Sequence, residues 1–164
     1  MTDTTSTTSA EDEARRLEAV NNAIRDLLHR PEVAERLRAA GPEEWSALQI
    51  VGHMNEMIPY WMGHARNMAA ATGEPPRFGR MLDAPERLEA VELGANGDPD
   101  KLLRQLDAVC RAAAADIRGL SPAERAKTGI HLRRGEMTVG AVIEDLVVHH
   151  AEEHEAQIRQ VLGH

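Results

Sequence analysis

Apolar residues recur every three or four positions in four long segments of the chain, which is the spacing of one face of an amphipathic α-helix. These segments lie in a chain of 164 residues and cover residues 11–29, 46–72, 98–119 and 139–162. Aromatic residues make up only 2% of the composition, so the core must be built mainly from aliphatic side chains and methionine. Both observations favour helices packed on helices over a β-sandwich. The sequence therefore predicts an all-α fold in which four helices form a bundle.

Signals between these segments indicate how the helices are ordered in space. Ser46, Asp98 and Thr138 are suitable N-caps, because short polar side chains accept hydrogen bonds from the first free N–H groups of a helix. Residues 73–97 are punctuated by glycine and proline and are too many for a tight connection between neighbours. A long crossover between helices two and three lets them run parallel, with helices two and four antiparallel. We also expect short helical pieces over 85–91 and 121–128 and a partly extended stretch over 129–137.

The composition of its first residues and its net charge limit the class of protein to which the chain can belong. Residues 1–10 are polar and threonine-rich, which is typical of a disordered tail, and residues 11–164 fit a single domain. The formal net charge of -8 argues against nucleic acid as a partner, because phosphate binding needs a basic surface. No run approaches the roughly 18 apolar residues of a membrane span, and the first residues lack the apolar stretch of a signal peptide. We therefore expect a cytoplasmic protein that binds a small molecule.

Three histidines occupy positions where the helical pattern requires a core residue. His150 and His154 differ by about 40° around the helix axis and share one inward stripe. That stripe consists of Ile143, Val147, His150, His154, Ile158 and Val161. His53 belongs to the corresponding stripe of the second helix, which consists of Ile50, His53, Met57, Trp61, His64 and Met68. At a rise of about 1.5 Å per residue, the histidines of these two antiparallel helices stand at about the same height.

A divalent metal is the partner that such a cluster predicts. Neutral imidazoles are ligands of zinc. Two of them at positions i and i+4 of one helix point to the same place, and a third from a facing helix completes a set of three ligands. Burying the rings unpaired would cost about 1–3 kcal/mol each. In the alternative interpretation, the rings bond one another and nearby carbonyl groups around a water molecule. His149 points away from the stripe, and we expect His64 and His131 to be structural or surface residues.

Two segments carry a resemblance to a known family: EWSALQIVGHMNEMIPYW at 44–61 and GEMTVGAVIEDLVVHHAEEHEAQIRQVL at 135–162. With these segments the chain resembles the DinB-like family of metal-dependent four-helix-bundle proteins. The resemblance implies an up-down-down-up topology and a divalent metal ion held by His53, His150 and His154. It also implies an activity, since relatives include S-transferases and isomerases that use low-molecular-weight thiols such as mycothiol or bacillithiol. Other relatives are described only as stress-induced.

Our leading hypothesis is therefore a metal-dependent enzyme, a thiol-dependent S-transferase or a related activity. Zinc is the first choice of metal, with nickel, manganese or iron as alternatives, and a low-molecular-weight thiol is the second cofactor. A simple hydrolase is less favoured because the sequence offers no clear general base. The alternative hypothesis is a non-catalytic, stress-related bundle protein that binds a metal or another ligand. We also expect a homodimer formed through exposed helix faces.

Overall fold

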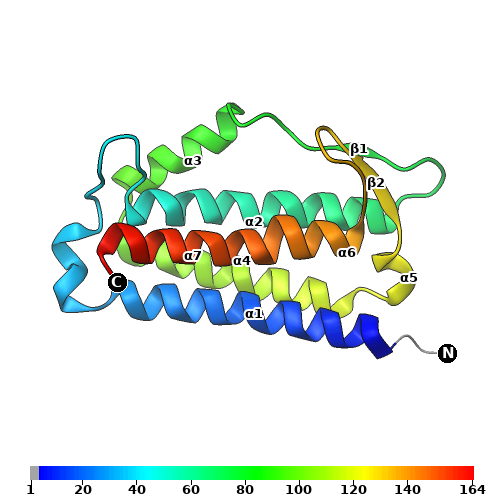
Figure 1. Ribbon diagram of the computed structural model, residues 1–164, viewed down its shortest axis with the longest axis horizontal. Helices are drawn as coiled ribbons and strands as arrows, with labels where there is room; N and C mark the ends of the chain where they lie inside the picture. The colour runs from blue at the N-terminus through cyan, green and yellow to red at the C-terminus, as the bar shows by residue number, and fades with distance from the viewer. Residues whose placement is uncertain (1–3) are drawn as a thin grey trace.

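Four long helices lie along a common axis in the computed structural model of the chain and form the bundle (Figure 1). The structure describes residues 4–164. The bundle consists of α1 (Thr4–Leu28), α2 (Ala47–Ala70), α4 (Pro99–Gly119) and a C-terminal helix in three consecutive parts, α6 (Val139–Ala141), η2 (Val142–Val148) and α7 (His149–Leu162). The shorter elements are η1 (Pro31–Arg36), β1 (Arg77–Phe78), α3 (Pro85–Asn96), α5 (Pro122–Arg125), β2 (Thr128–His131) and β3 (Gly135–Thr138).

The directions of the four helices confirm the predicted up-down-down-up topology. In Figure 1, α1 and the C-terminal helix run towards the end of the bundle where the C-terminus lies, and α2 and α4 run the opposite way. The long crossover between α2 and α4 makes this order possible, because it returns the chain to the end at which α2 began. α3 forms part of this return and spans 12 residues, which is longer than the short piece expected over 85–91.

The polar residues that precede the helices cap them as the sequence predicts. Ser46 Oγ accepts a hydrogen bond from the Gln49 backbone N–H at 3.2 Å, and Gln49 Oε1 accepts one from the Ser46 N–H at 2.8 Å. Thr138 caps the C-terminal helix by accepting a hydrogen bond from the Ala141 N–H. Gly163 ends that helix with a φ of 74°, a left-handed conformation that favours glycine. Each cap contributes about 1 kcal/mol, so local chemistry fixes where the helices begin and end.

Helix α1 begins earlier than the sequence analysis expected. It starts at Thr4, so the expectation of a disordered tail over residues 1–10 is wrong for the helical residues 4–10, while residues 1–3 lie outside the described part of the chain. Ala10 and Ala14 extend the apolar stripe of Leu17 towards the N-terminus, and all three are buried. Alanine contributes little to a hydropathy pattern but is the strongest helix former, which is why the polar composition was misleading.

A small three-stranded sheet lies at one end of the bundle (Figure 1). β2 and β3 form an antiparallel hairpin in the stretch that was expected to be partly extended. β1 pairs with β2 in parallel, with Phe78 opposite His131, and no sequence pattern predicted this strand. The pairing ties the crossover to the hairpin, so that both segments are held in place beside α2.

Helix α2 packs closely against the crossover helix α3. The two helices meet at Gly52 and Gly94, and a Cβ atom at Gly94 would lie 2.3 Å from the carbonyl oxygen of Leu48. This distance is far shorter than a van der Waals contact, so only glycine allows the two backbones to approach this closely. The contact holds α3, and with it the end of the crossover, against the bundle.

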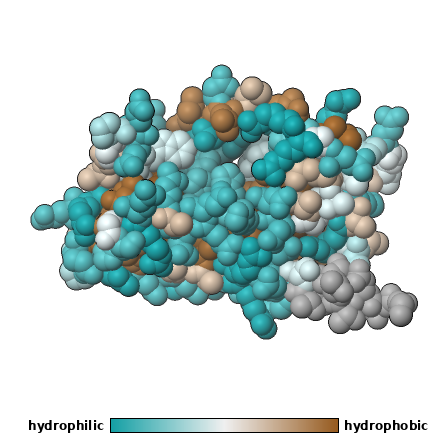
Figure 2. Space-filling model, in the orientation of Figure 1, coloured by the Kyte–Doolittle hydropathy of each residue, from teal (hydrophilic) through white to brown (hydrophobic). Residues whose placement is uncertain are grey.

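Most of the surface seen in Figure 2 is hydrophilic, and apolar residues gather along its upper edge, where Figure 1 places α3 and the segment before it. The large exposed apolar side chains of this part of the chain are Met81, Leu82, Leu88 and Leu93. Among the described residues, none of the helices combines the length and the apolar character that crossing a membrane would require.

Ion pairs hold the C-terminal helix against the rest of the bundle. Arg16 of α1 lies between Glu144 of η2, at 2.9 Å, and Glu152 of α7, at 2.5 Å. Deeper in the fold, Arg125 and Glu13 form an ion pair at 2.8 Å with side chains that are 8% and 5% exposed. Such contacts fix the position of one helix relative to another more than they add net stability. The two ion pairs of Arg16 therefore help to place α7, which carries two of the three histidines considered below.

Candidate metal centre

Helix α2 carries His53 in its second turn, on the face towards the core. His53 is 2% exposed, and its ring lies against the ring of Trp45 at a centroid distance of 5.1 Å. Trp45 directly precedes the capping residue Ser46, so the start of the helix and its neighbouring aromatic ring position the imidazole together. The apolar members of the stripe predicted for this helix are all buried: Ile50, Met57, Trp61 and Met68.

Helix α7 carries His150 and His154, and a π-helical segment, η2, precedes it. Within this segment the wider i→i+5 bonding applies, and the His149 N–H donates to the Glu144 carbonyl oxygen. A wider turn changes the rotation of the residues that follow it, and π-helical turns are frequent at functional sites. The stripe predicted for the C-terminal helix is buried from Ile143 to Ile158, except that His150 is half-buried. At the end of the helix the buried residue is Leu162, whereas the predicted Val161 is only half-buried.

The three imidazoles lie together, as the sequence analysis predicted. The ring centroids of His53 and His154 are 4.8 Å apart, those of His53 and His150 are 6.2 Å apart, and those of His150 and His154 are 4.6 Å apart. One nitrogen atom from each ring lies within 4.8 Å of the other two. Two antiparallel helices thus bring residues far apart in the sequence to the same height and the same side of the core.

Several nitrogen atoms of this cluster are buried without a hydrogen-bond partner among the described residues. They are both ring nitrogens of His53 and Nε2 of His154, so no hydrogen bond joins His53 to either of the other rings. An unpaired buried polar atom costs about 1–3 kcal/mol. A divalent metal ion binds one nitrogen of each imidazole at about 2.0–2.1 Å, so it would satisfy one ring nitrogen of His53 and Nε2 of His154. The donor set therefore fits a metal ion.

The three histidines are held in the neutral form. Burial, followed by the effects of His154 and Arg87, lowers the pKa of His53 to about 3. Burial and the neighbouring His154 lower the pKa of His150 to about 4. Burial also lowers the pKa of His154, although the hydrogen bond that His154 donates to Gln157 acts in the opposite direction. Neutral imidazole is the form that binds metal ions, so burial keeps all three rings ready to act as ligands near pH 7.

Gln157 orients the ring of His154. Its Oε1 atom lies 3.0 Å from His154 Nδ1, and because Oε1 only accepts hydrogen bonds, Nδ1 carries the proton and donates it. The lone pair then belongs to Nε2, which is the buried nitrogen without a partner. A hydrogen bond of this kind, which fixes the tautomer and the ring angle, accompanies most metal-binding histidines.

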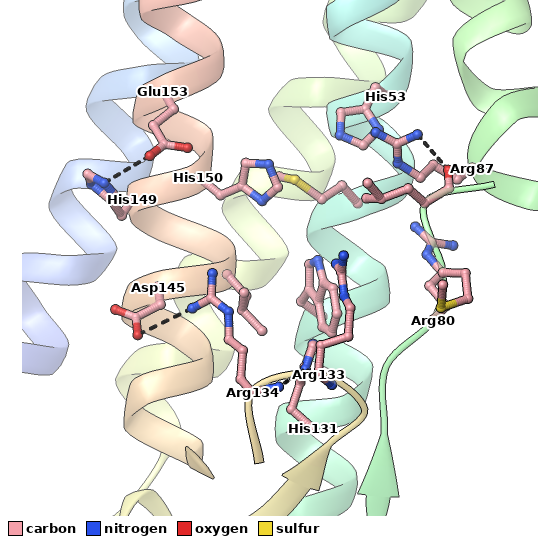
Figure 3. A pocket seen from close by; sticks show the side chains of 15 residues that line it. His53, Arg80, Arg87, His131, Arg133, Arg134, Asp145, His149, His150 and Glu153 are labelled. Atoms are coloured by element: carbon pink, nitrogen blue, oxygen red, sulfur yellow. Dashed lines mark hydrogen bonds and ion pairs between the residues drawn. The ribbon is translucent and has the colours of Figure 1, made fainter. Parts of the chain in front are cut away.

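A cavity of about 340 Å³ opens beside His53 and His150 (Figure 3). Its walls come from α2, from the crossover and α3, from the β2–β3 turn and from the C-terminal helix. The volume is suited to a small molecule. Besides the two histidines, its charged and polar lining consists of Arg80, Arg87, His131, Arg133, Arg134, Asp145, His149 and Glu153.

Part of this lining could not be found from the helical pattern. His131 and His149, to which the sequence analysis gave no role in a site, both line the cavity. His131 is buried and stacks on Trp61 at a centroid distance of 5.6 Å, which agrees with the predicted structural role. The arginines lie on the crossover, on α3 and in the hairpin turn. The adjacent Arg133 and Arg134, in the stretch expected to be partly extended, are a hint that the sequence contains.

Comparisons with known proteins place this geometry in a family. A search of the curated proteins found no match. Among solved structures, YfiT from Bacillus subtilis, described as a probable metal-dependent hydrolase with an unusual four-helix bundle topology, is similar to this chain with a TM-score of 0.75. The likeness covers 93% of this chain and 85% of that chain at 18% sequence identity, and it shows a shared fold. The sequence itself matches the DinB superfamily over residues 16–158, and the chain therefore belongs to that superfamily.

Proposed function

We propose that the protein is an enzyme that binds one divalent metal ion through His53, His150 and His154. The observation that carries the proposal is the group of three neutral imidazoles beside a cavity, with buried, unpartnered nitrogens on His53 and His154. Three protein ligands leave a coordination position open, which is the pattern of catalytic rather than structural zinc sites. Zinc is our first choice because imidazole nitrogens suit it, and nickel, iron and manganese are the alternatives to test.

The reaction that we propose is S-transfer from a low-molecular-weight thiol. A divalent ion held by these histidines would lower the pKa of a thiol or a water molecule beside it and so supply a nucleophile near neutral pH. In the proposed transfer, the sulfur forms a bond to an electrophilic carbon and the bond from that carbon to its leaving group breaks. The thiol proton passes to solvent, so no oxidant or reductant is required.

The charged groups around the cavity support a thiol over water as the nucleophile. Asp145 lies 3.8 Å from Arg134, and Glu153 lies 3.0 Å from His149. Both lining carboxylates are therefore engaged, so a water molecule would depend on the metal alone for its activation, without the help of a general base. A thiol, with an ordinary pKa of about 8.5, loses its proton far more readily and needs no such base.

A turnover assay on metal-free and reconstituted protein tests the proposal. The protein is stripped of metal, dialysed, and loaded with one equivalent of zinc, nickel, manganese or iron. Each form is then incubated with a small thiol and an aryl halide, and the thioether product is measured by mass spectrometry. We expect turnover with at least one metal and loss of turnover in the stripped protein and in a His150→Ala variant. His29→Ala, which replaces an exposed histidine at the end of α1, is the matched control and should retain turnover.

A second arm of the assay uses ester and amide substrates without thiol. Hydrolysis in this arm, with no thioether in the first, would contradict the S-transferase proposal in favour of the activity described for YfiT. Absence of turnover in both arms from protein that holds its metal would contradict the enzyme proposal itself. The non-catalytic metal-binding protein would then be the better description.

A further inference from the structure

Positive charge is concentrated in the cavity beside the histidines. Four arginines line it, Arg80, Arg87, Arg133 and Arg134, against two carboxylates, although the whole chain carries a formal net charge of -8. Figure 3 shows these arginines on two walls, one formed by the crossover and α3 and the other by the hairpin turn. A cleft lined by one sign of charge raises the local concentration of ligands of the opposite sign.

Two of the four arginines are already paired with carboxylates. Arg80 forms a bidentate ion pair with Glu56, with both distances at 2.5 Å, and its guanidinium lies 3.7 Å from the centroid of the Tyr60 ring. Arg134 lies 3.8 Å from Asp145. These contacts hold the two walls in place and partly neutralise the two guanidinium groups.

Arg87 is half-buried and has no carboxylate partner among the described residues. Its guanidinium donates one hydrogen bond, to the carbonyl oxygen of Leu82 at 2.8 Å, which leaves most of its five N–H donors free. It also lies 5.2 Å from the centroid of the Trp45 ring, and that ring contacts His53. Arg87 is therefore next to the candidate metal ligand, where a carboxylate or phosphate would find a strong, charge-assisted partner.

Arg133 is the second arginine without a carboxylate partner in the described part of the chain, and its backbone is fixed. His131 Nδ1 accepts hydrogen bonds from the backbone N–H groups of Arg133, at 3.0 Å, and of Arg134, at 3.1 Å. Because His131 is buried and stacked on Trp61, the turn that presents Arg133 to the cavity is anchored in the core. A fixed backbone at this position lowers the part of the entropy cost that ordering the turn would add to ligand binding.

We infer that the substrate carries an anionic group, a carboxylate or a phosphate, which Arg87 and Arg133 bind while its reactive end lies at the three histidines. The inference rests on the proposed function for the reactive end, whereas the anion site itself needs no metal. Met57 and Leu146 also line the cavity, so the part of the substrate between its two ends is apolar. The substrate class is thus a small organic anion.

Calorimetric titration of the full-length, metal-free protein with succinate, succinamide and inorganic phosphate tests the anion site. Succinate and succinamide are similar in size, and only succinate is charged. We expect succinate or phosphate to bind at least tenfold more tightly than succinamide, and Arg87→Gln and Arg133→Gln each to weaken that binding by about tenfold. Tighter binding of succinate identifies a carboxylate as the preferred group, and tighter binding of phosphate identifies a phosphate. Arg104→Gln, which replaces an exposed arginine of α4 outside the cavity lining, should bind like the wild type.

Equal affinity for succinate and succinamide, or binding of neither anion, would overturn the inference. Wild-type affinity in the Arg133→Gln variant would do the same, and because Arg133 is exposed, its replacement leaves the fold intact. A separate zinc titration of the same protein distinguishes the two proposals. Anion binding without zinc binding would refute the proposed function and leave the anion site standing, whereas zinc binding without anion binding would refute this inference alone.

Discussion

Replacing His53 by leucine should stabilise the metal-free protein. Both ring nitrogens of His53 are buried without a partner, and each unpaired polar atom costs about 1–3 kcal/mol. Leucine has a similar volume and removes both atoms, while the misfit of a hydrophobic replacement of similar size costs less than about 1.5 kcal/mol. We therefore expect the free energy of unfolding of metal-free His53→Leu to exceed that of the metal-free wild type by about 2 kcal/mol.

The order should change when zinc is added. A ligand that binds only the folded state stabilises it by about 2.7 kcal/mol when its free concentration is 100 times its Kd. The wild type should gain this free energy, whereas His53→Leu, which has lost one of three ligands, should gain little. Zinc should thus remove the advantage of the variant or reverse it.

Urea unfolding followed by circular dichroism, with and without zinc, measures both effects. His64→Leu is the matched control, because His64 is a half-buried histidine on the same helix and lies outside the cluster; it should respond to zinc as the wild type does. The reasoning is refuted if metal-free His53→Leu is no more stable than the metal-free wild type. It is also refuted if zinc stabilises both proteins equally.

Three further predictions concern pH, a buried ion pair and a helix contact. The metal-free protein should lose stability as the pH falls from 6.5 towards 4. The folded-state pKa values of the clustered histidines are lowered, so the unfolded chain binds more protons than the folded chain in this range. Urea unfolding at each pH measures this loss, and a free energy of unfolding that does not change with pH would contradict the prediction. Arg125→Met should cost about 3–5 kcal/mol because it leaves Glu13 buried and unpaired, and the double variant Arg125→Met/Glu13→Leu should recover most of the loss in the same assay. Gly94→Ala should lower the melting temperature because of the backbone contact at 2.3 Å, whereas Gly63→Ala, with nothing within 4 Å, should raise it slightly.

The bundle could be predicted because its signals are local and repeated. The apolar spacing marks all four helices, and Ser46, Asp98 and Thr138 cap the second, third and fourth of them as expected. Once the long crossover is recognised, the helix directions follow, and a constant rise per residue then brings His53 level with His150 and His154. The convergence of the three rings was therefore predictable from periodicity and helix geometry.

The remaining features depend on contacts between segments that are distant in the sequence. The π-helical segment over 142–148 has the same apolar pattern as an α-helix, so nothing in its sequence reveals the wider turn. β1 has two residues and exists because it pairs with β2 across about 50 positions. Arg87 and Arg133 reach the cavity from α3 and from a turn, where no periodicity indicates which way a side chain points. The cluster of three histidines could thus be predicted, but not the charged cavity beside it.

The stoichiometry of metal binding tests the central claim most directly. Metal-free wild type, His154→Ala and His149→Ala are titrated with zinc, and bound metal is measured after removal of the excess. Our account predicts one tightly bound ion per chain in the wild type and a large loss of affinity in His154→Ala. His149→Ala, which replaces an exposed histidine of the same helix outside the cluster, should bind one ion as tightly as the wild type. Equal zinc binding by His154→Ala and the wild type, or no binding by the wild type, would contradict it.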